Sequence, residues 1–327
     1  MLGIGFAGTF AASLEPSVRA ELDLPCEISV ADEAGIVSKL GGVDVLVSLA
    51  FTREMAAAAP RLKLVQVPGA GLDRIDRAAL PPGVRLANVY GHEVGIAEYV
   101  LGAMLALTRQ LFSLDAALRR GDWQSQWAVG TPPPAVWPEL AGKTLGVLGY
   151  GRIGQALAHR ARALDMQILA IRRTPTRPDP PGVGMVAGPE ALGDVLARAD
   201  YVAVTLPLTP ETRGLLADRE LRVMKPTAIL VNVARASIVD EAALYAALAE
   251  GRLAGAALDV WYRYPTEPGP TWPSRHPFHE LPNVLMTPHV SGWTDGMLAA
   301  RARLIAENIR RTARGEDPLN LIPARGA

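Results

Sequence analysis

Residues 143–158 read KTLGVLGYGRIGQALA. A short β-prone run ends at Gly149, and apolar residues recur at helical spacing around and after Gly154. In a turn of the type G-x-G-x-x-G, the first glycine permits a tight turn and the second lets the backbone approach a pyrophosphate. The third lets the helix pack closely on the strand. Because a strand precedes the glycines and a helix follows them, this stretch predicts a nucleotide site in a parallel α/β sheet.

A second match to the same pattern, GIGFAG, stands at residues 3–8. Only Met1 and Leu2 precede it, so its glycines are expected inside the first strand rather than after it. Pro16 falls in about the second turn of any helix that begins beyond the match. We therefore expect GIGFAG to belong to an opening strand and to bind no cofactor.

The composition is that of a globular chain with balanced charge. Of its 327 residues 49% are hydrophobic and 20% charged, and the formal net charge is +0. Electrostatic binding to nucleic acid or to a membrane surface relies on basic excess, so neither partner is expected. The first arginine is Arg19, and no run of 18 apolar residues occurs. These features indicate a cytoplasmic protein.

Apolar runs alternate with helical patterns on both sides of the glycine turn. The runs occupy residues 2–7, 43–49, 62–67, 168–171, 201–206, 228–233, 256–260 and 284–287. Strands that alternate with helices form parallel sheets. The two sets predict an α/β fold of two doubly wound parallel-sheet lobes, Rossmann-like or flavodoxin-like, joined by hinge segments.

A long apolar segment, residues 96–121, lies between the two sets. It predicts one helix of unusual length that ends at Gly121 with two arginines in its last turn. The segment is apolar on more than one face, which suits either a hinge helix buried between lobes or a helix that also packs on a second subunit. We expect a homodimer formed through this region.

Three polar side chains come directly after predicted strands, where open parallel sheets bind ligands. Arg235, in VNVARASIVD, offers a planar fork that suits a carboxylate, and Asp259, in ALDVW, ends the next strand. His289 follows Thr287-Pro288 and has an ordinary pKa of about 6.5, which suits proton transfer near neutrality. The alternatives are a solvated arginine and a structural histidine.

Three other histidines carry weaker signals. His276 and His279 have a spacing that could serve a metal, but Pro277 between them breaks a helix and no cysteine or acidic cluster accompanies them. No metal is expected. His92, at the entry to the long helix, suits either a substrate contact or a plain hinge role.

Six stretches together resemble the D-isomer-specific 2-hydroxyacid dehydrogenase family, which includes glyoxylate/hydroxypyruvate reductases, phosphoglycerate dehydrogenases and formate dehydrogenases. They run in order along nearly the whole chain: VPGAGLDRID (67–76), RRGDW (119–123), LAGKTLGVLGYGRIGQALA (140–158), ADYVAVTLPLTPETRGLL (199–216), VNVARASIVDEAAL (231–244) and LPNVLMTPHVSG (281–292). The resemblance implies a substrate lobe of residues 1–94 plus 291–327 that closes on a dinucleotide-binding lobe of residues 95–290. It also implies hydride transfer between NAD(P)H and a small 2-oxo acid/2-hydroxy acid pair.

The resemblance also implies roles for individual residues. Arg235 would hold the substrate carboxylate and polarise the 2-oxo group, and His289 would give a proton to that oxygen. Backbone amides of Ala70 and Gly71 would complete the carboxylate site. Asp259 would help to fix the nicotinamide. The implied cofactor-binding residues are Gly149, Gly151, Arg152, Ile153, Gly154, Arg172, Arg173, Thr174, Pro207, Thr212, Val233, Ala234, Asp259, His289 and Gly292.

The chain departs from the family pattern beyond Asp259. Family members usually read DVFxxEP, with the glutamate paired to the catalytic histidine, but this chain reads DVWYRYP. Tyr264 takes the place of the acid and joins the expected catalytic set, and Glu267 follows three residues later. A phenol does not raise a histidine pKa as a carboxylate does. Reductive kcat/KM should therefore fall as pH rises through a value near or below about 6.5, unless Glu267 folds back.

The coenzyme and the substrate are less specified. The strand at 168–171 runs into Arg172-Arg173-Thr174, with no carboxylate for the ribose hydroxyls of NAD. Two guanidiniums suit a 2′-phosphate, so NADP is expected, with NAD as the alternative.

A non-catalytic NAD(H)-sensing protein like the C-terminal-binding-protein corepressors is the alternative function. The substrate cannot be named, because its pocket also depends on Ser48 to Phe51, Tyr90 and Trp293.

Overall fold

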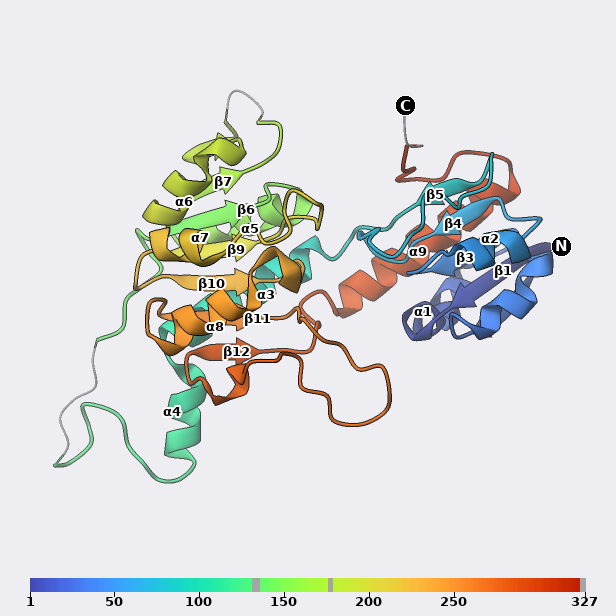
Figure 1. Ribbon diagram of the computed structural model, residues 1–327. Helices are drawn as coiled ribbons and strands as arrows, with labels where there is room; N and C mark the ends of the chain where they lie inside the picture. Colours follow the sequence, from blue (N-terminus) through green and yellow to red (C-terminus); the bar gives the residue numbers. More distant parts are fainter. Residues whose placement is uncertain (131–135, 176–178, 324–327) are drawn as a thin grey trace. The chain divides into compact units, whose positions relative to one another are not determined.

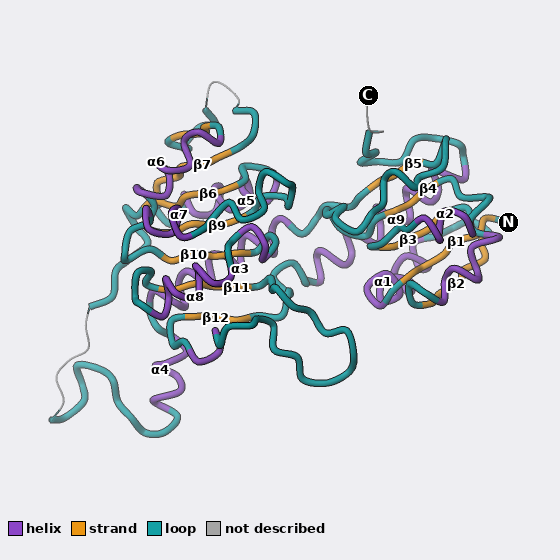
Figure 2. The backbone as a smooth tube through the Cα atoms, viewed as in Figure 1, coloured by secondary structure: helices purple, strands orange, loops and turns teal. Residues whose placement is uncertain are grey.

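The computed structural model describes residues 1–130, 136–175 and 179–323 (Figures 1 and 2). The chain divides into two compact units, unit 1 (Met1–His92 with Trp293–Ala327) and unit 2 (Glu93–Gly292). Both crossings between the units lie two residues from the predicted lobe boundaries. Residues 324–327 of the predicted substrate lobe lie outside the described residues. Figure 2 shows that each unit carries its own set of strands.

Unit 1 is built on a five-stranded parallel sheet in the order β2-β1-β3-β4-β5, the order of flavodoxin-like folds. Its elements are β1 (Leu2–Ala7), α1 (Thr9–Glu21), β2 (Cys26–Ala31), a 3₁₀ segment (Gly35–Gly42), β3 (Val45–Ser48), α2 (Arg53–Ala58), β4 (Leu64–Gln66), β5 (Arg85–Ala87) and α9 (Asp295–Ala313). As predicted, Gly3 and Gly5 lie inside β1, but Gly8 lies beyond it as the N-cap of α1, with φ 87, and α1 contains Pro16. A Cβ at Gly3 would approach the carbonyl oxygen of Gly42 to 2.0 Å, so the first glycine of GIGFAG is needed for packing.

Unit 2 is built on a seven-stranded parallel sheet in the order β12-β11-β10-β9-β6-β7-β8. Its strands are β6 (Thr144–Leu148), β7 (Gln167–Ile171), β8 (Met185–Ala187), β9 (Tyr201–Val204), β10 (Ile229–Asn232), β11 (Gly255–Leu258) and β12 (Val284–Met286). The chain adds β7 and β8 on one side of β6 and then starts again with β9 on the other. A doubly wound sheet binds its ligand at such a switch point. The predicted fold class is confirmed in both units.

Helices cover both faces of the larger sheet. They are α3 (Glu93–Thr108), α5 (Arg152–Arg162), α6 (Leu192–Arg198), α7 (Asp218–Val223) and α8 (Glu241–Ala249), with α4 (Leu111–Leu118) following α3. One apolar core packs α3 and α5 on the sheet and includes Val231, whereas the other packs α6, α7 and α8 and includes Leu230. Successive residues of β10 thus face opposite cores, which explains why its sequence is apolar without alternation.

The prediction of one long helix over residues 96–121 is wrong. The segment forms α3 and α4, which meet at a bend of 58°. Gln110 lies between them with φ 52 in the left-handed region, and the Thr108 hydroxyl lies 2.9 Å from the Tyr201 hydroxyl. The helix is interrupted at Arg109 and Gln110, directly after Thr108. Among the described residues no single helix is long and apolar enough to span a bilayer, and this bent pair passes that test only when its halves are combined.

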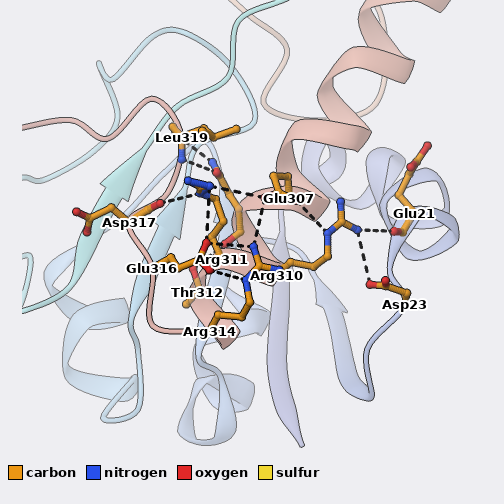
Figure 3. Close-up of polar contacts among 11 residues, drawn as sticks. Glu21, Asp23, Glu307, Arg310, Arg311, Thr312, Arg314, Glu316, Asp317 and Leu319 are labelled. Carbon is orange, nitrogen blue, oxygen red and sulfur yellow. Dashed lines mark hydrogen bonds and ion pairs between the residues drawn. The ribbon is translucent and has the colours of Figure 1, made fainter.

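Helix α9 fastens the C-terminal segment to unit 1. Arg310 pairs with Glu307 at 3.0 Å and donates to the Glu21 carbonyl at the end of α1 (Figure 3). Both side chains are partly buried, at 24% and 31% exposed, and ion pairs near the surface contribute about 0–1 kcal/mol each. The buried side chain of Asn308 makes a second link: its Nδ2 donates to Gln66 Oε1 at 2.6 Å, and its Oδ1 accepts from the Leu319 amide. This network holds the end of β4, from which the loop carrying Ala70 and Gly71 begins.

Candidate active site

The glycine turn between β6 and α5 has the geometry of a nucleotide site. Gly149 has φ +109, and a Cβ there would lie 2.8 Å from the Leu206 amide nitrogen. A Cβ at Gly154 would lie 2.4 Å from the Gly149 carbonyl oxygen, whereas nothing lies within 4 Å of one at Gly151. No side chain caps the N-terminus of α5, where Arg152 and Ile153 begin the helix. The turn therefore leaves open space and helix amides where a dinucleotide pyrophosphate would bind.

A threonine that the sequence analysis missed closes this turn. Thr205 Oγ1, just after β9, donates to the Gly149 carbonyl at 2.7 Å, and the Thr205 amide donates to Leu148 at 2.8 Å. These bonds join β9 to β6 at the switch point of the sheet. Further along the same loop, Thr212 Oγ1 donates to the Pro207 carbonyl at 2.7 Å, so these two predicted cofactor residues lie together.

The end of β7 is cationic. Arg172 is half-buried, and Arg173 and Thr174 are exposed. The Glu211 carboxylate is in the field of Arg173: the pKa of Glu211 is lowered mainly by a hydrogen bond with Thr209 and also by this arginine. The predicted pair of guanidiniums is therefore accessible, although one of them faces a nearby carboxylate.

Arg235, Asp259 and His289 follow the neighbouring strands β10, β11 and β12. Parallel strands end at one edge of the sheet, so their polar groups gather there. Asn232 shapes the Arg235 turn: its Nδ2 donates to the Arg235 carbonyl at 3.1 Å and its Oδ1 accepts from the Ala234 amide. The half-buried Arg235 is close enough to lower the pKa of His289. The predicted residues Val233 and Ala234 are buried in this turn, and Gly292 follows His289 by three residues.

Asp259 organises the loop that carries His289. Its carboxylate is 0% exposed and accepts hydrogen bonds from the Thr287 hydroxyl at 2.7 Å, the Val290 amide at 2.8 Å and the Ser291 amide at 2.9 Å. These donors lie on both sides of His289. All three bonds join the buried carboxylate to the loop that carries His289. The contact of Asp259 with the nicotinamide stays a prediction.

His289 is held in an uncommon backbone conformation. Its φ is 59, in the left-handed region that few non-glycine residues adopt. The loop is fixed by Thr287, whose carbonyl accepts from Trp261 Nε1 at 2.8 Å and whose hydroxyl lies 2.6 Å from the Tyr99 hydroxyl. Strained conformations that the surroundings enforce are concentrated at functional sites. The hydrogen bonds of Thr287 thus help to fix the position of the His289 imidazole.

Tyr264 lies against His289. The Tyr264 hydroxyl is 2.8 Å from His289 Nδ1 and accepts a hydrogen bond from the Trp261 amide at 3.3 Å. Partial burial of the imidazole is the main cause that lowers the pKa of His289; Arg235 acts in the same direction and Asp259 opposes it. Glu267 is exposed and forms no hydrogen bond or ion pair with any residue that the structure describes. In this structure the phenol, and not that carboxylate, stands beside the histidine.

The remaining predicted residues lie in unit 1. Ala70 and Gly71 are half-buried in the loop after β4, and the Ala70 carbonyl accepts from Asn88 Nδ2 at 3.0 Å. Neither backbone amide donates to a residue in the described ranges, and adjacent amides of this kind suit an anion. His92 is 7% exposed, with Nδ1 3.2 Å from Arg301 Nη2. Among the described residues no group of three His, Cys, Asp or Glu is arranged to hold a metal ion.

Comparisons with known proteins agree with this architecture. Residues 101–291 match the model of the D-isomer specific 2-hydroxyacid dehydrogenase, NAD binding domain. Glyoxylate reductase of Thermococcus gammatolerans is 34% identical over 92% of this chain and 87% of its own length. D-3-phosphoglycerate dehydrogenase of Methanocaldococcus jannaschii is 36% identical over 88% of this chain, but the match spans only 53% of that protein.

Solved structures show the same similarity across both units. A D-isomer specific 2-hydroxyacid dehydrogenase from Xanthobacter autotrophicus Py2, in complex with NADPH and MES, has a TM-score of 0.79 at 31% identity, covering 99% of this chain and 98% of that one. An NADPH-dependent glyoxylate/hydroxypyruvate reductase from Sinorhizobium meliloti, in complex with NADP and malonate, has a TM-score of 0.80 at 28% identity, covering 99% and 97%. This chain belongs to the D-isomer specific 2-hydroxyacid dehydrogenases, a family of oxidoreductases.

Proposed function

We propose that this protein reduces small 2-oxo acids to D-2-hydroxy acids and that NADPH is its preferred coenzyme. One observation carries the proposal: the fold brings an arginine and a strained, hydrogen-bonded histidine to the sheet edge that also carries an open glycine turn. The bound coenzyme would supply the hydride. The relatives named as glyoxylate reductases support a substrate of this class.

Residues of unit 2 have separate roles in binding the substrate and in proton transfer to it. Arg235 binds the carboxylate and draws electron density from the 2-oxo group, because its fork matches two oxygens. His289 gives a proton from Nε2 to the carbonyl oxygen as the carbon is reduced. Asp259 and Thr287 keep the imidazole in place, and Tyr264 occupies its other nitrogen.

Turnover with a panel of 2-oxo acids tests the proposal directly. Glyoxylate and hydroxypyruvate are each supplied with NADPH and with NADH, and oxidation of the coenzyme is followed by absorbance. Saturable turnover of either acid supports a reductase. Tight coenzyme binding with no turnover of any acid in the panel would instead favour a protein that senses NAD(H).

The coenzyme preference is expected to depend on Arg172 and Arg173. A charge-assisted contact contributes about 1.5–3 kcal/mol, which corresponds to roughly 10- to 100-fold in affinity. The double variant Arg172→Ser/Arg173→Ser should therefore lose about that factor in kcat/KM with NADPH and change little with NADH. The matched control is Arg219→Ser, which removes an exposed arginine from α7. A wild-type kcat/KM with NADH that equals or exceeds the value with NADPH would refute the preference.

We further infer that the surface around α4 is covered by a second copy of the chain. Leu111, Phe112 and Leu118 are 51%, 61% and 52% exposed, and Trp123 and Trp127 beyond the helix are 59% and 78% exposed. Contiguous exposed apolar surface marks interaction sites, and two-fold homodimers are the commonest assembly. Light scattering should give twice the chain mass of 34.7 kDa, and Phe112→Glu should lower it. If the wild-type protein has the mass of one chain at micromolar concentration, the dimer is contradicted. The control variant is Val223→Glu on α7, which should keep the wild-type mass.

A further inference from the structure

The Tyr264 hydroxyl has a defined hydrogen-bonding pattern. A backbone amide only donates, so the bond between the Trp261 nitrogen and the Tyr264 hydroxyl at 3.3 Å has the phenol oxygen as acceptor. The phenol has one proton of its own, and His289 Nδ1 lies 2.8 Å from the oxygen. Partial burial raises the pKa of Tyr264, so the phenol keeps that proton near neutrality. When His289 is neutral, the hydroxyl can donate to Nδ1, and the imidazole then carries its single proton on Nε2.

A carboxylate in the same place would have the opposite effect. An ionised acid only accepts hydrogen bonds, so it requires a proton on Nδ1 and leaves Nε2 of the neutral ring bare. The two partners therefore favour different tautomers of neutral histidine. Tyr264 and a glutamate at this position also differ in charge, and a negative charge nearby raises the pKa of an imidazole.

We propose that Tyr264 is a positioning residue that holds neutral His289 as the Nε2-protonated tautomer and thereby lowers both the pH at which reduction gives way to oxidation and the height of the oxidative plateau relative to the reductive one. This inference rests on the proposed function. Reduction uses the imidazolium: Nε2 gives its proton to the substrate oxygen, the carbon gains the hydride, and the ring is left neutral with its proton on Nδ1. Oxidation needs that last form, because Nε2 must be bare to take the proton of the 2-hydroxyl group.

The tautomer favoured by Tyr264 is inactive in oxidation. Its Nε2 already carries a proton, so only the minor Nδ1-protonated form can accept another. A hydrogen bond of this kind shifts an equilibrium by roughly 2- to 10-fold. The same bond stabilises the neutral ring against the imidazolium. The pH midpoint at which reductive kcat/KM falls is therefore shifted to a lower value. The enzyme does not change the equilibrium constant of the overall reaction. A shift in the pH midpoint of His289 must therefore be matched by a change in the ratio of the oxidative plateau at high pH to the reductive plateau at low pH, by about tenfold for each pH unit.

Other charges face the imidazole and bear on this pH dependence. Arg235 acts to lower the pKa of His289 and Asp259 acts to raise it. Both belong to neighbouring strand ends and are unchanged by a substitution at residue 264. A change that follows such a substitution is therefore due to the partner at Nδ1.

Nuclear magnetic resonance of the protein with ¹⁵N-labelled histidine tests the tautomer without any turnover. The chain has five histidines, and the His289→Asn variant identifies the His289 signals by their loss. Above the pH midpoint, Nε2 is expected to carry the proton and Nδ1 to be bare. In Tyr264→Phe the preference should weaken by roughly 2- to 10-fold, so that a form protonated on Nδ1 becomes visible. Tyr245→Phe is the matched control, because that ring stacks on His276 and should leave the His289 signals unchanged.

Kinetics of Tyr264→Glu supply the second measurement. The pH midpoint of reduction should move upward, and the oxidative plateau at high pH should rise relative to the reductive plateau at low pH by the matching factor. A neutral wild-type His289 with its proton on Nδ1, or a Tyr264→Phe spectrum identical to that of the wild type, overturns the inference. Absence of turnover in the wild type would refute the proposed function and leave the tautomer assignment standing, so the two failures are distinguishable.

Discussion

His289→Asn is expected to lower kcat for reduction of a 2-oxo acid by about 10²- to 10⁴-fold, the usual contribution of a general acid. The KM for the 2-oxo acid should change much less, because Arg235 still binds the carboxylate. A residue that acts only in the chemical step lowers kcat and kcat/KM together. Steady-state kinetics below the pH midpoint of the wild type, where its imidazole is protonated, measures the full effect.

Asparagine is the informative replacement because of the backbone at this position. His289 has φ 59, and asparagine tolerates the left-handed region better than alanine does. The loop bonds to Asp259 from Val290 and Ser291 are backbone bonds and should survive. His159→Asn, on the exposed surface of α5, is the matched control and should keep wild-type kinetics. A folded His289→Asn enzyme with near-wild-type kcat would remove this residue from proton transfer.

The two parallel sheets could be predicted from the sequence because most of their strands are buried on both faces. YVAV in β9 and ILVN in β10 read as continuous apolar runs bounded by loops, which is typical of parallel sheets. The strands without a prediction are short or lie at a sheet edge: β5 and β8 have three residues each, and β2 is an edge strand with part of its surface exposed. Such strands lack the apolar run that would reveal them.

The helix break at Gln110 was not predictable from periodicity, because the apolar pattern continues on both sides of it. The break depends on one left-handed backbone conformation and on a contact between Thr108 and a tyrosine distant in sequence. Patterns of hydrophobicity carry no information about such contacts. The same limit explains why the sequence predicts one helix where the structure has two.

For the candidate site, the sequence predicted which residues gather but not how they are connected. Arg235 and His289 follow strands, and a parallel sheet brings strand ends together. The buried bonds from Asp259 and the role of Thr205 at the glycine turn depend on three-dimensional contacts between loops. The alignment of DVWYRYP predicts that Tyr264 stands near the histidine. The Trp261 amide, which makes the phenol an acceptor, becomes visible only in the structure.

Arg235→Ala is expected to raise the KM for the 2-oxo acid and to lower kcat/KM by about 10²- to 10⁴-fold. The loss corresponds to two charge-assisted hydrogen bonds of about 1.5–3 kcal/mol each. The reason is geometric, since a planar fork matches both oxygens of a carboxylate and alanine offers no donor. Arg235→Lys should recover part of the loss, because it restores the positive charge but not the paired donors.

Binding of a carboxylate that cannot be reduced separates this role from damage to the turn. Oxamate should compete with the substrate in the wild type and lose affinity in Arg235→Ala, while coenzyme affinity stays near the wild-type value. The turn is held by two bonds from Asn232 to backbone atoms and by one from Arg235 itself, whose Nη1 donates to the Ala234 carbonyl at 2.8 Å. The coenzyme affinity of the variant therefore reports whether loss of that bond has disturbed the turn. Arg219→Ala, 90% exposed on α7, controls for the loss of one positive charge. If oxamate binds Arg235→Ala as tightly as the wild type, the carboxylate is held elsewhere, and the assignment of Arg235 fails even where kcat has fallen.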